Sequence, residues 1–542
     1  MSRWRAVNAR ASPISLRRRC EPAPEPIRQH AVEAAIQRRT SPMRLAVLIL
    51  SLALAAHGAP AGAQVPGNDL PDIGNPASTT LSISEEYRIG LAILRELRQA
   101  GRIVEDPEVN EYLQSLGLRL ASEAHEGGYR FTFFAVKDGA INAFALPGGF
   151  IGVHAGLVTA TRSEGELAGV LAHEIAHVTQ RHIARSLQQA GRSNLAAAAA
   201  ILAAVLIGAT TGMPGDAMMG TISAAQGLAA QQQINFTRAN ETEADRVGVG
   251  VLAAAGFDPQ AMPDFFQTMQ QRAGSTGRNI PELLRTHPVT TERIAETRDR
   301  ASRMAAEPRA DSASYGLIRK RLHLQSLPPE TRFRELYAGA ASADRPASDA
   351  DVYGRALALA RAGDFEPAIG LLTGLRDRRP ELTLYHAALG QVQLEAGRIT
   401  AARATLERAL RLFPRSVPVT MRYAETLLRT GDAKRAHTVL LDLFNNVPPT
   451  PEQARFTAVA ANAAGDVADA YYYLSEYHVM NGDLPLALDQ LRMAQAVPGI
   501  NSVQRERFDA RIRELQEYLP KGRRAREVPG TATREPEGTA RR

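Results

Sequence analysis

Cysteine is almost absent from this sequence. The 542 residues contain one cysteine, Cys20, and one tryptophan, Trp4, and both lie upstream of Met43. We expect residues 1–42 to be an over-extended N-terminus, with Met43 as the true start. No cysteine remains after that segment, which excludes disulfide bonds. The mature protein must therefore be stabilised by packed hydrophobic cores, and its length is sufficient for two or three domains.

Hydrophobic runs long enough to cross a bilayer are missing as well. The run Leu45–Ala56 has twelve mostly apolar residues, whereas a helix that crosses a bilayer needs about 20. Met43-Arg44 precedes this run, and the small residues Ala61-Gly62-Ala63 follow it. A basic start, a short apolar core and an A-x-A site are typical of a cleavable signal peptide, which we place at residues 43–63. Because no cysteine follows the cleavage site, we expect an exported protein that is not a lipoprotein.

An excess of positive charge is missing from the mature chain. The formal net charge is +7, but residues 1–44 contain ten arginines and three acidic residues and so carry the whole excess. A balanced remainder is not typical of nucleic-acid-binding proteins, and no nucleic-acid partner is expected. Residues 519–542 contain seven basic and three acidic residues together with proline, glycine and threonine. This composition predicts a disordered basic tail.

One short motif has a defined chemistry. HEIAH at residues 173–177 places His173 and His177 about 40° apart on one face of a helix and one turn apart along it. Both imidazoles can therefore reach one zinc ion, and Glu174 can take a proton from water bound to that ion. The pattern S-x-x-E at residues 163–166 is a capping box at a plausible helix start. We therefore expect one Zn²⁺ per chain and hydrolysis of peptide bonds.

Zinc catalysis needs a third protein ligand. The pattern HExxHxxGxxH does not fit, and His182, about 140° round the helix, is expected to be a surface residue or a neighbour of the ligands. The segment ETEAD at residues 241–245 offers a glutamate instead. Glu241 and Asp245 share a helix face, so Glu241 can bind zinc while Asp245 hydrogen-bonds the outer nitrogen of a ligand histidine. Glu243 points about 200° away from Glu241 and is the weaker candidate.

The second half of the sequence is a repeat array. Pairs of the form G-x4-A recur every 34 residues, at Gly363, Gly397, Gly431 and Gly465. This period is typical of tetratricopeptide repeats (TPR), in which helix pairs stack into a solenoid. A further pair at Gly482 follows after 17 residues, the length of one helix, so the last helices are expected to pair in an altered register. A cluster of tyrosines near this point is expected either to belong to the core or to line a recognition face; it consists of Tyr471, Tyr472, Tyr473 and Tyr477.

Together these motifs resemble the M48 zinc metallopeptidases. The matching segments are HEIAHVTQRH at residues 173–182, ExEADRxG at residues 241–248, and Thr286-His287-Pro288 followed by Arg293. With its repeats, the chain is similar to the bacterial periplasmic branch of the family, the β-barrel assembly-enhancing protease type. The resemblance implies zinc ligands, a catalytic base and a supporting or proton-donating carboxylate. These are His173, His177 and Glu241 as ligands, Glu174 as base and Asp245 as the supporting residue.

His287 has three interpretations. It could be a mobile gate that fills the open zinc position, a transition-state donor that acts with Arg293, or a His-Pro turn at a helix start. The resemblance favours a role at the site. The gate interpretation predicts that removal of the imidazole increases cleavage, and the donor interpretation predicts a large loss.

Three short strands are expected before the catalytic helix, at residues 130–136, 141–146 and 150–153, with a turn at Pro147-Gly148-Gly149. Zinc proteases commonly bind the substrate as an added strand on a sheet edge beside the metal. The candidate edge is Asn142, Ala143, Phe144, Ala145 and Leu146, and an ordinary core hairpin is an equally good interpretation.

An apolar segment separates the two zinc motifs. Residues 195–209 contain no polar side chain, and Met213-Pro214-Gly215 interrupts the stretch. Three interpretations of residues 195–220 stay open: a buried helical hairpin, a peripheral membrane contact, and a mobile apolar flap over the site that suits unfolded substrates.

The expected fold is an α+β zincin-like metalloprotease domain at residues 81–338, followed by an all-α TPR solenoid at residues 351–518. A linker is expected at residues 339–350, and helices at residues 315–324 and 330–337 are expected to bridge the two parts. The resemblance implies a periplasmic endopeptidase that degrades misfolded or misassembled outer-membrane β-barrel proteins and whose repeats dock on clients or on the assembly machinery. The alternative is a chaperone-like TPR scaffold with latent protease activity.

Overall fold

The computed structural model describes residues 81–124, 128–189, 238–276, 281–304, 310–336 and 347–517. Several sequence-based expectations lie outside these ranges, namely those for residues 1–42 and 43–63, the apolar segment 195–220 and the tail 519–542. None of the helices within the described ranges combines the length and the hydrophobicity that a bilayer-spanning helix needs.

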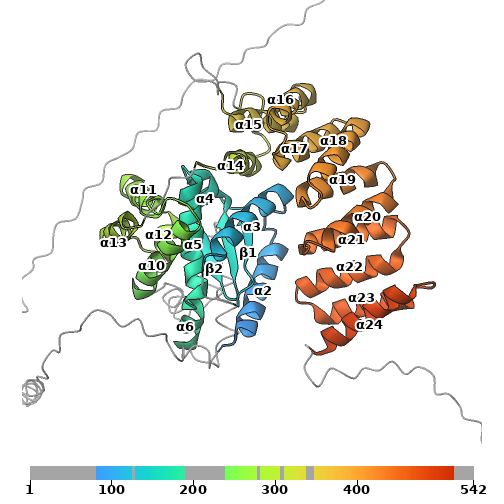
Figure 1. The fold of residues 1–542 in the computed structure, drawn as a ribbon, viewed down its shortest axis with the longest axis horizontal. Coiled ribbons are helices and arrows are strands. Elements are labelled where there is room, and N and C mark those ends of the chain that lie inside the picture. The colour runs from blue at the N-terminus through green and yellow to red at the C-terminus, as the bar shows by residue number, and fades with distance from the viewer. Residues whose placement is uncertain are drawn as a thin grey trace, which may run out of the picture. The chain divides into compact units, whose positions relative to one another are not determined.

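A small mixed sheet lies at the centre of the protease part (Figure 1). Its strands are β1 (Thr132–Val136), β2 (Ala143–Leu146) and β3 (Phe150–His154), arranged in the order β1-β3-β2. β1 pairs with β3 in parallel, and β2 pairs with β3 antiparallel across the glycine turn. All three strands form where the sequence predicts them, and β2 lies at an edge of the sheet that the structure describes. The position of β2 agrees with the expected edge, although Asn142 precedes the strand.

Helix α5 (Glu164–Thr179) carries the HEIAH motif and is buried along nearly its whole length. A helix that is apolar on all sides must be enclosed by other elements, and α5 lies between the sheet and α10 (Arg238–Ala254) (Figure 1). Ser163 caps its first turn by accepting a hydrogen bond from the Glu166 amide. The expected reciprocal bond of the capping box is absent among the described contacts, because the Glu166 carboxylate accepts from the Arg162 amide instead.

The close approach of α10 to α5 depends on Gly248. A Cβ atom at this position would lie 3.1 Å from the Cα and N atoms of His173, which is tighter than ordinary van der Waals contact. The glycine at the end of ExEADRxG therefore has a direct structural purpose. It lets the helix that carries the predicted third ligand pack against the backbone of the helix that carries the first two.

The remaining helices of the protease part enclose this centre (Figure 1). They are α2 (Ile83–Gln99), α3 (Pro107–Ala121), α4 (Ala155–Ala160), α6 (His182–Gln189), α11 (Ala261–Thr276), α12 (Glu282–Thr286), α13 (Thr291–Ser302) and α14 (Ala313–Ser326). The predicted bridging helix at residues 315–324 is confirmed as α14. The helix predicted at residues 330–337 is wrong for the residues described there, because residues 330–336 form turns and bends after Pro328-Pro329.

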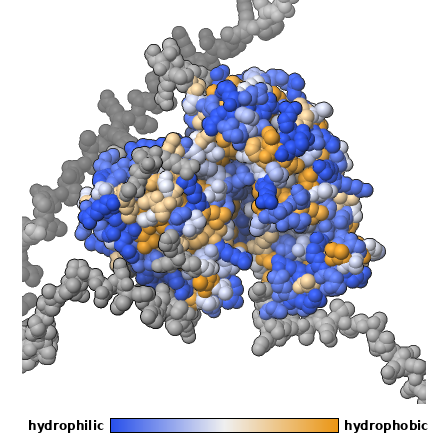
Figure 2. Space-filling view, in the orientation of Figure 1, coloured by the Kyte–Doolittle hydropathy of each residue, from blue (hydrophilic) through white to orange (hydrophobic). Residues whose placement is uncertain are grey.

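The second part is the predicted all-helical solenoid. Its helices are α15 (Asp349–Arg361), α16 (Phe365–Arg378), α17 (Thr383–Glu395), α18 (Ile399–Leu412), α19 (Val417–Arg429), α20 (Ala433–Phe444), α21 (Pro451–Ala463), α22 (Val467–Met480), α23 (Leu484–Ala496) and α24 (Ser502–Glu517). Each repeat glycine adopts a positive φ between two helices, including Gly363 at 82° and Gly465 at 87°. Figure 2 shows hydrophilic residues over most of the visible solenoid surface, with small hydrophobic areas between them.

The last helices pair in the altered register that the glycine spacing predicts. Helix α22 packs against both α21 and α23, and α24 closes this end of the array. Tyr472 stacks on Phe508 of α24 at a centroid distance of 5.6 Å, and Tyr473 is buried. The core interpretation therefore holds for these two tyrosines.

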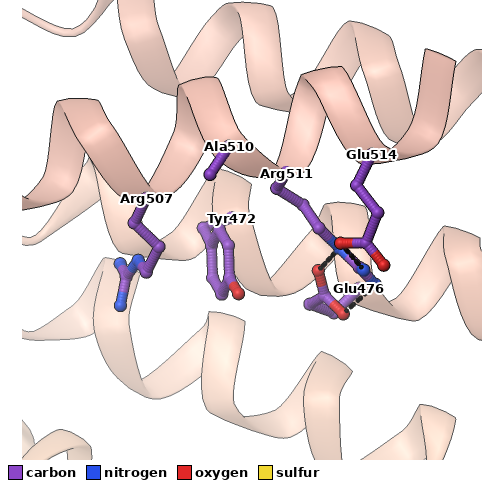
Figure 3. Close-up of a pocket in the computed structure, with 6 residues that line it drawn as sticks. All are labelled: Tyr472, Glu476, Arg507, Ala510, Arg511 and Glu514. Carbon is purple, nitrogen blue, oxygen red and sulfur yellow. Dashed lines mark hydrogen bonds and ion pairs between the residues drawn. The ribbon is translucent and has the colours of Figure 1, made fainter. Parts of the chain in front are cut away.

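A concavity between α22 and α24 is lined by charged residues that already neutralise one another (Figure 3). Arg511 bonds both oxygens of Glu476 at 2.8 Å and contacts Glu514 at 2.7 Å. The Arg507 guanidinium lies over the Tyr472 ring, 4.2 Å from its centroid. This arrangement fastens the last helix to the array, so we assign the concavity a structural role.

A buried ion network joins the protease part to the solenoid. The N-terminus of α3 provides Asp106 and Glu108, and Arg321 of α14 reaches Asp106 Oδ2 at 2.8 Å and Glu108 Oε2 at 3.2 Å. From the solenoid, Arg422 of α19 reaches the same Glu108 oxygen at 3.1 Å. Burial alone would raise the pKa of Asp106, but Arg321 and Arg422 outweigh it and lower that pKa to about 2. Asp106 therefore remains ionised at neutral pH beside these two arginines, and the contact between Arg422 and Glu108 joins the two parts.

Glu111 should make this contact sensitive to pH. Its Oε1 accepts a hydrogen bond from the Val417 amide of the solenoid at 3.2 Å. Burial raises the pKa of Glu111 to about 7, with Glu108 adding to the effect. A folded-state pKa above the ordinary value of 4.5 means that the stability contribution is complete below pH 4.5 and is lost as pH rises through 7.

We therefore expect Glu111→Gln to stabilise the protein at pH 8 by about 1–3 kcal/mol and to have little effect at pH 4.5. Glutamine keeps an oxygen for the Val417 amide but cannot ionise. Urea unfolding at the two pH values measures the difference, with Glu96→Gln on the exposed surface of α2 as the control. If Glu111→Gln changed the free energy of unfolding equally at both pH values, the raised pKa of Glu111 would be contradicted.

Candidate active site

Four side chains from three segments converge beside the sheet. His173 and His177 come from α5, and Glu241 comes from the first turn of α10. His287 is the C-cap residue that directly follows α12. Each offers one ligand atom, and these atoms all lie within 4.8 Å of one another in a buried cluster. The structure thus brings together the three ligands that the sequence predicts and adds His287 as a fourth.

The two ligand histidines present the same nitrogen to the cluster. The Nε2 atoms of His173 and His177 are 3.0 Å apart, and each lies 3.5 Å from an oxygen of Glu241. The Nδ1 atoms therefore face away from the cluster toward other parts of the protein. This arrangement leaves one nitrogen of each ring for a metal and the other for a supporting contact.

Asp245 supports His173 in the way the i, i+4 spacing predicts. Its Oδ1 lies 3.0 Å from His173 Nδ1. Arg293 of α13 in turn holds both Asp245 oxygens at 2.8 and 2.9 Å, and its Nη1 reaches Glu241 Oε2 at 2.9 Å and the Pro288 carbonyl at 2.7 Å. The Arg293 guanidinium is thus directed at the metal-binding carboxylate and its neighbour. This geometry favours a positioning role over that of a transition-state donor.

Glu174 lies on the inner side of the cluster and is fully buried. Neither of its carboxylate oxygens accepts a hydrogen bond of ordinary geometry from the described residues, and His287 Nε2 lies 3.6 Å from Glu174 Oε1. Burial raises the pKa of the Glu174 carboxyl above its usual range, against the opposing effect of His287 and His173. A carboxylate with a raised pKa and free lone pairs is suited to accept a proton.

The electrostatics of the cluster favour a divalent cation. Burial would lower the pKa of His173, but Asp245 and Glu241 outweigh it and raise that pKa to about 10. Burial and the charge of His173 hold the pKa of His177 well below its usual value, so this ring is neutral. The carboxylates that retain a proton on His173 would equally stabilise a metal ion in its place. Two imidazole nitrogens and one carboxylate oxygen are the ligand set of catalytic zinc sites, so the residues fit this metal.

His287 occupies the position next to both carboxylates. Its Nδ1 lies 3.0 Å from Glu241 Oε1 and 3.4 Å from His173 Nε2. The residue ends α12 rather than starting a helix, so the simple His-Pro turn at a helix start does not describe it. With His287 in place, the side chains of the cluster are no more than 5% exposed.

His182 does not lie where a continuous helix would place it. Helix α5 ends at Thr179, and Arg181 adopts a left-handed conformation with φ of 56°. The turn brings His182 behind His177, where it is fully buried. It is thus a neighbour of the ligands and not a surface residue.

A second group of metal-capable side chains lies in the solenoid, formed by His437, Asp466 and Asp469. There the Arg507 guanidinium already binds Asp469, and Gln504 contacts Asp466 at 3.3 Å. An arginine thus occupies the place next to the carboxylates that a cation would need. We therefore assign the metal to the cluster at His173.

Comparison with known proteins agrees with this geometry. Residues 107–301 match peptidase family M48, and residues 393–460 match a tetratricopeptide repeat family. A putative β-barrel assembly-enhancing protease of Vibrio cholerae is 34% identical over 86% of this chain and 96% of its own length. The β-barrel assembly-enhancing protease of Escherichia coli K12 is 32% identical over 83% of this chain and 91% of its own length. The chain belongs to peptidase family M48.

A further relative matches a smaller share of the chain. The mitochondrial metalloendopeptidase OMA1 of Arabidopsis thaliana is 32% identical over 32% of this chain. Family membership makes the chain a metallopeptidase of the HExxH type with a TPR region, and the buried cluster at His173 is its metal site.

Proposed function

We propose that this M48 metallopeptidase is a periplasmic zinc-dependent endopeptidase that degrades misfolded or misassembled outer-membrane β-barrel proteins. The observation that carries the proposal is the similarity over nearly the whole length of proteins named for β-barrel assembly, together with a buried HExxH site. The signal-peptide pattern at residues 43–63 supports export. The TPR region supports docking on clients or on the assembly machinery, because solenoids bind protein segments on extended surfaces.

The described side chains fit a single reaction. Bound zinc would act as a Lewis acid and lower the pKa of its water toward about 7. Glu174 accepts the proton of the attacking water and then delivers it to the leaving nitrogen of the peptide bond. Asp245 and Arg293 hold His173 and Glu241 in place while charge develops at the scissile carbonyl. The β2 edge, at residues 142–146, is the candidate site for an extended substrate.

The structure favours the interpretation of His287 as a gate. A catalytic zinc site keeps one position open for water, and His287 places an imidazole nitrogen next to the three ligands instead. Activity then requires that the segment after α12 moves His287 away from Glu241. This closed arrangement also favours the alternative function, a chaperone-like scaffold whose protease activity is latent.

We expect His287→Ala to increase cleavage of an unfolded protein by about 3–30-fold, because it removes a competitor for the open position. Initial rates of casein cleavage with saturating zinc measure the effect. Arg285→Ala, a change two residues earlier at an exposed position of α12, is the control and should leave the rate unchanged. A rate at least tenfold below that of the wild type would instead identify His287 as a transition-state donor.

The substrate class is tested with one β-barrel protein in two states. The purified zinc-loaded enzyme is incubated with an outer-membrane β-barrel protein diluted from urea, and with the same protein folded in detergent. We expect fragments from the unfolded form, none from the folded form, and no cleavage after chelation. Cleavage of both forms at equal rates, or of neither form by the wild type and by the His287→Ala variant alike, would contradict the proposal.

A further inference from the structure

His182 and Glu243 form a contact chain behind the metal ligand His177. His182 Nδ1 lies 2.8 Å from His177 Nδ1, and His182 Nε2 lies 2.9 Å from Glu243 Oε2. Arg185 holds the same Glu243 oxygen at 2.9 Å. His182 is fully buried, so its ring cannot exchange these partners for water without movement of α6.

The chain of contacts permits one arrangement of protons once a metal is bound. His177 directs its Nε2 at the cluster, so a metal takes that lone pair and the proton must be on Nδ1. His177 Nδ1 then donates to His182 Nδ1, which must be unprotonated. The proton of a neutral His182 is therefore on Nε2, where Glu243 accepts it. Along His177, His182 and Glu243, each hydrogen-bond donor therefore faces an acceptor.

The local backbone is shaped to make this contact. The left-handed conformation of Arg181 is uncommon for a residue other than glycine and is stored only where surrounding contacts maintain it. Here the Arg181 side chain bonds Glu86 of α2, with Nε 3.0 Å from Oε1. The turn ends α5 and sends His182 back against the outer face of His177, a place that a continuous helix would not reach.

Glu243 and Asp245, both on α10, therefore have matching roles. Asp245 contacts the outer nitrogen of His173 directly, and Glu243 contacts the outer nitrogen of His177 through His182. The direction of Glu243, away from Glu241, excludes it as a ligand and aims it at α6. One helix thus supplies the third ligand and a carboxylate for each of the other two.

We propose that His182, backed by Glu243, is a positioning residue that fixes the tautomer and ring orientation of the metal ligand His177. The proposal deepens the proposed function and rests on it only in requiring a metal at the cluster. Contacts of this kind typically change metal affinity by about 10–100-fold. The effect should therefore appear in metal binding itself, and not only in proteolysis.

The test compares His182→Phe with His182→Asn in the full chain. Phenylalanine fills the space but cannot accept a hydrogen bond, whereas the asparagine oxygen takes the place of Nδ1 as the acceptor. We expect His182→Phe to release zinc to a chelator about 10–100-fold faster and to alter the visible absorption of the cobalt-substituted protein. His182→Asn should restore both properties to within about threefold of the wild type. Glu243→Gln should have a smaller effect of the same sign, because it keeps the acceptor and loses the charge.

His386→Phe is the matched control, because His386 is a buried histidine of the solenoid that contacts the Pro380 carbonyl. It should leave zinc release and the cobalt spectrum unchanged. Unfolding midpoints of all variants separate positioning from packing. The proposal is overturned if His182→Phe retains wild-type zinc release, or if the asparagine variant loses zinc as fast as the phenylalanine variant. A wild-type protein that binds zinc but cleaves no outer-membrane protein would contradict the proposed substrate. The zinc-release test of His182 would still apply.

Discussion

Glu174→Gln is expected to bind one zinc ion per chain and to cleave an unfolded protein about 10²–10⁴-fold more slowly than the wild type. The substitution keeps the shape of the side chain and removes its ability to take a proton. Its oxygens are buried and make no hydrogen bonds to the described residues, so little of the fold depends on them. Zinc content by mass spectrometry and initial cleavage rates on a denatured protein measure the two properties separately.

The matched control is Glu166→Gln, on the same helix as Glu174 and also buried. The Glu166 carboxylate contacts the amide and guanidinium of Arg162, well away from the ligands. Its substitution should leave the cleavage rate of the folded protein within about threefold of the wild type, even if stability falls. A Glu174→Gln protein that still cleaves at the wild-type rate would remove Glu174 from the mechanism.

The same variant separates the two candidate functions. A scaffold that assists outer-membrane assembly without cutting should tolerate Glu174→Gln in cells, whereas a protease should not. Assembly of a β-barrel protein in cells that carry only the variant is the measurement. Normal assembly together with lost cleavage would favour the scaffold, and accumulation of misassembled forms would favour the protease.

The sequence predicts the metal ligands because their spacing is local. Two histidines four residues apart on a helix, and a glutamate and aspartate four residues apart on another, each place their side chains on one face whatever the surrounding fold. The 34-residue glycine period is equally local, since each repeat contacts mainly its neighbours. For these features, residue spacing contains nearly all the geometric information.

The sequence does not predict what depends on a break in regular structure. The positive φ of Arg181 occurs without a glycine or asparagine in the sequence, so α5 and α6 look like one helix, and such a helix leaves open whether His182 is a surface residue or a neighbour of the ligands. The signal that could have been used was the unfavourable number of polar residues at positions 180–182 for a buried helix. Arg293 was found through the family pattern, but its contact with Asp245 spans 48 positions and follows from no local rule.

The junction of the two parts does not follow from the sequence, for the same reason. Glu108 and Arg422 are separated by 314 positions, and neither belongs to a motif. Nothing in the charge pattern distinguishes Arg321 from the exposed arginines of the solenoid. Only the fold shows that it is among the most deeply buried cations of the described residues.

Arg321→Leu should be strongly destabilising, with an expected loss of about 3–5 kcal/mol in the free energy of unfolding. Leucine fills part of the space but leaves the carboxylates of Asp106 and Glu108 buried with Arg422 as their remaining cation. Urea unfolding at neutral pH measures the loss. Arg332→Leu is the control, because the Arg332 side chain is 82% exposed and should change stability by less than about 0.5 kcal/mol.

The pH dependence of this loss distinguishes charge from packing. The pKa of Asp106 in the folded protein is about 2, below the ordinary value of 3.8. The stability that depends on its ionised form is therefore complete above pH 3.8 and is lost as pH falls toward 2. The difference in the free energy of unfolding between the wild type and Arg321→Leu should then become smaller as pH falls from about 5 to 2. In the variant, protonation of Asp106 breaks no ion pair with Arg321. A difference that stays constant over this range would show that the arginine acts through its packing and not through its charge.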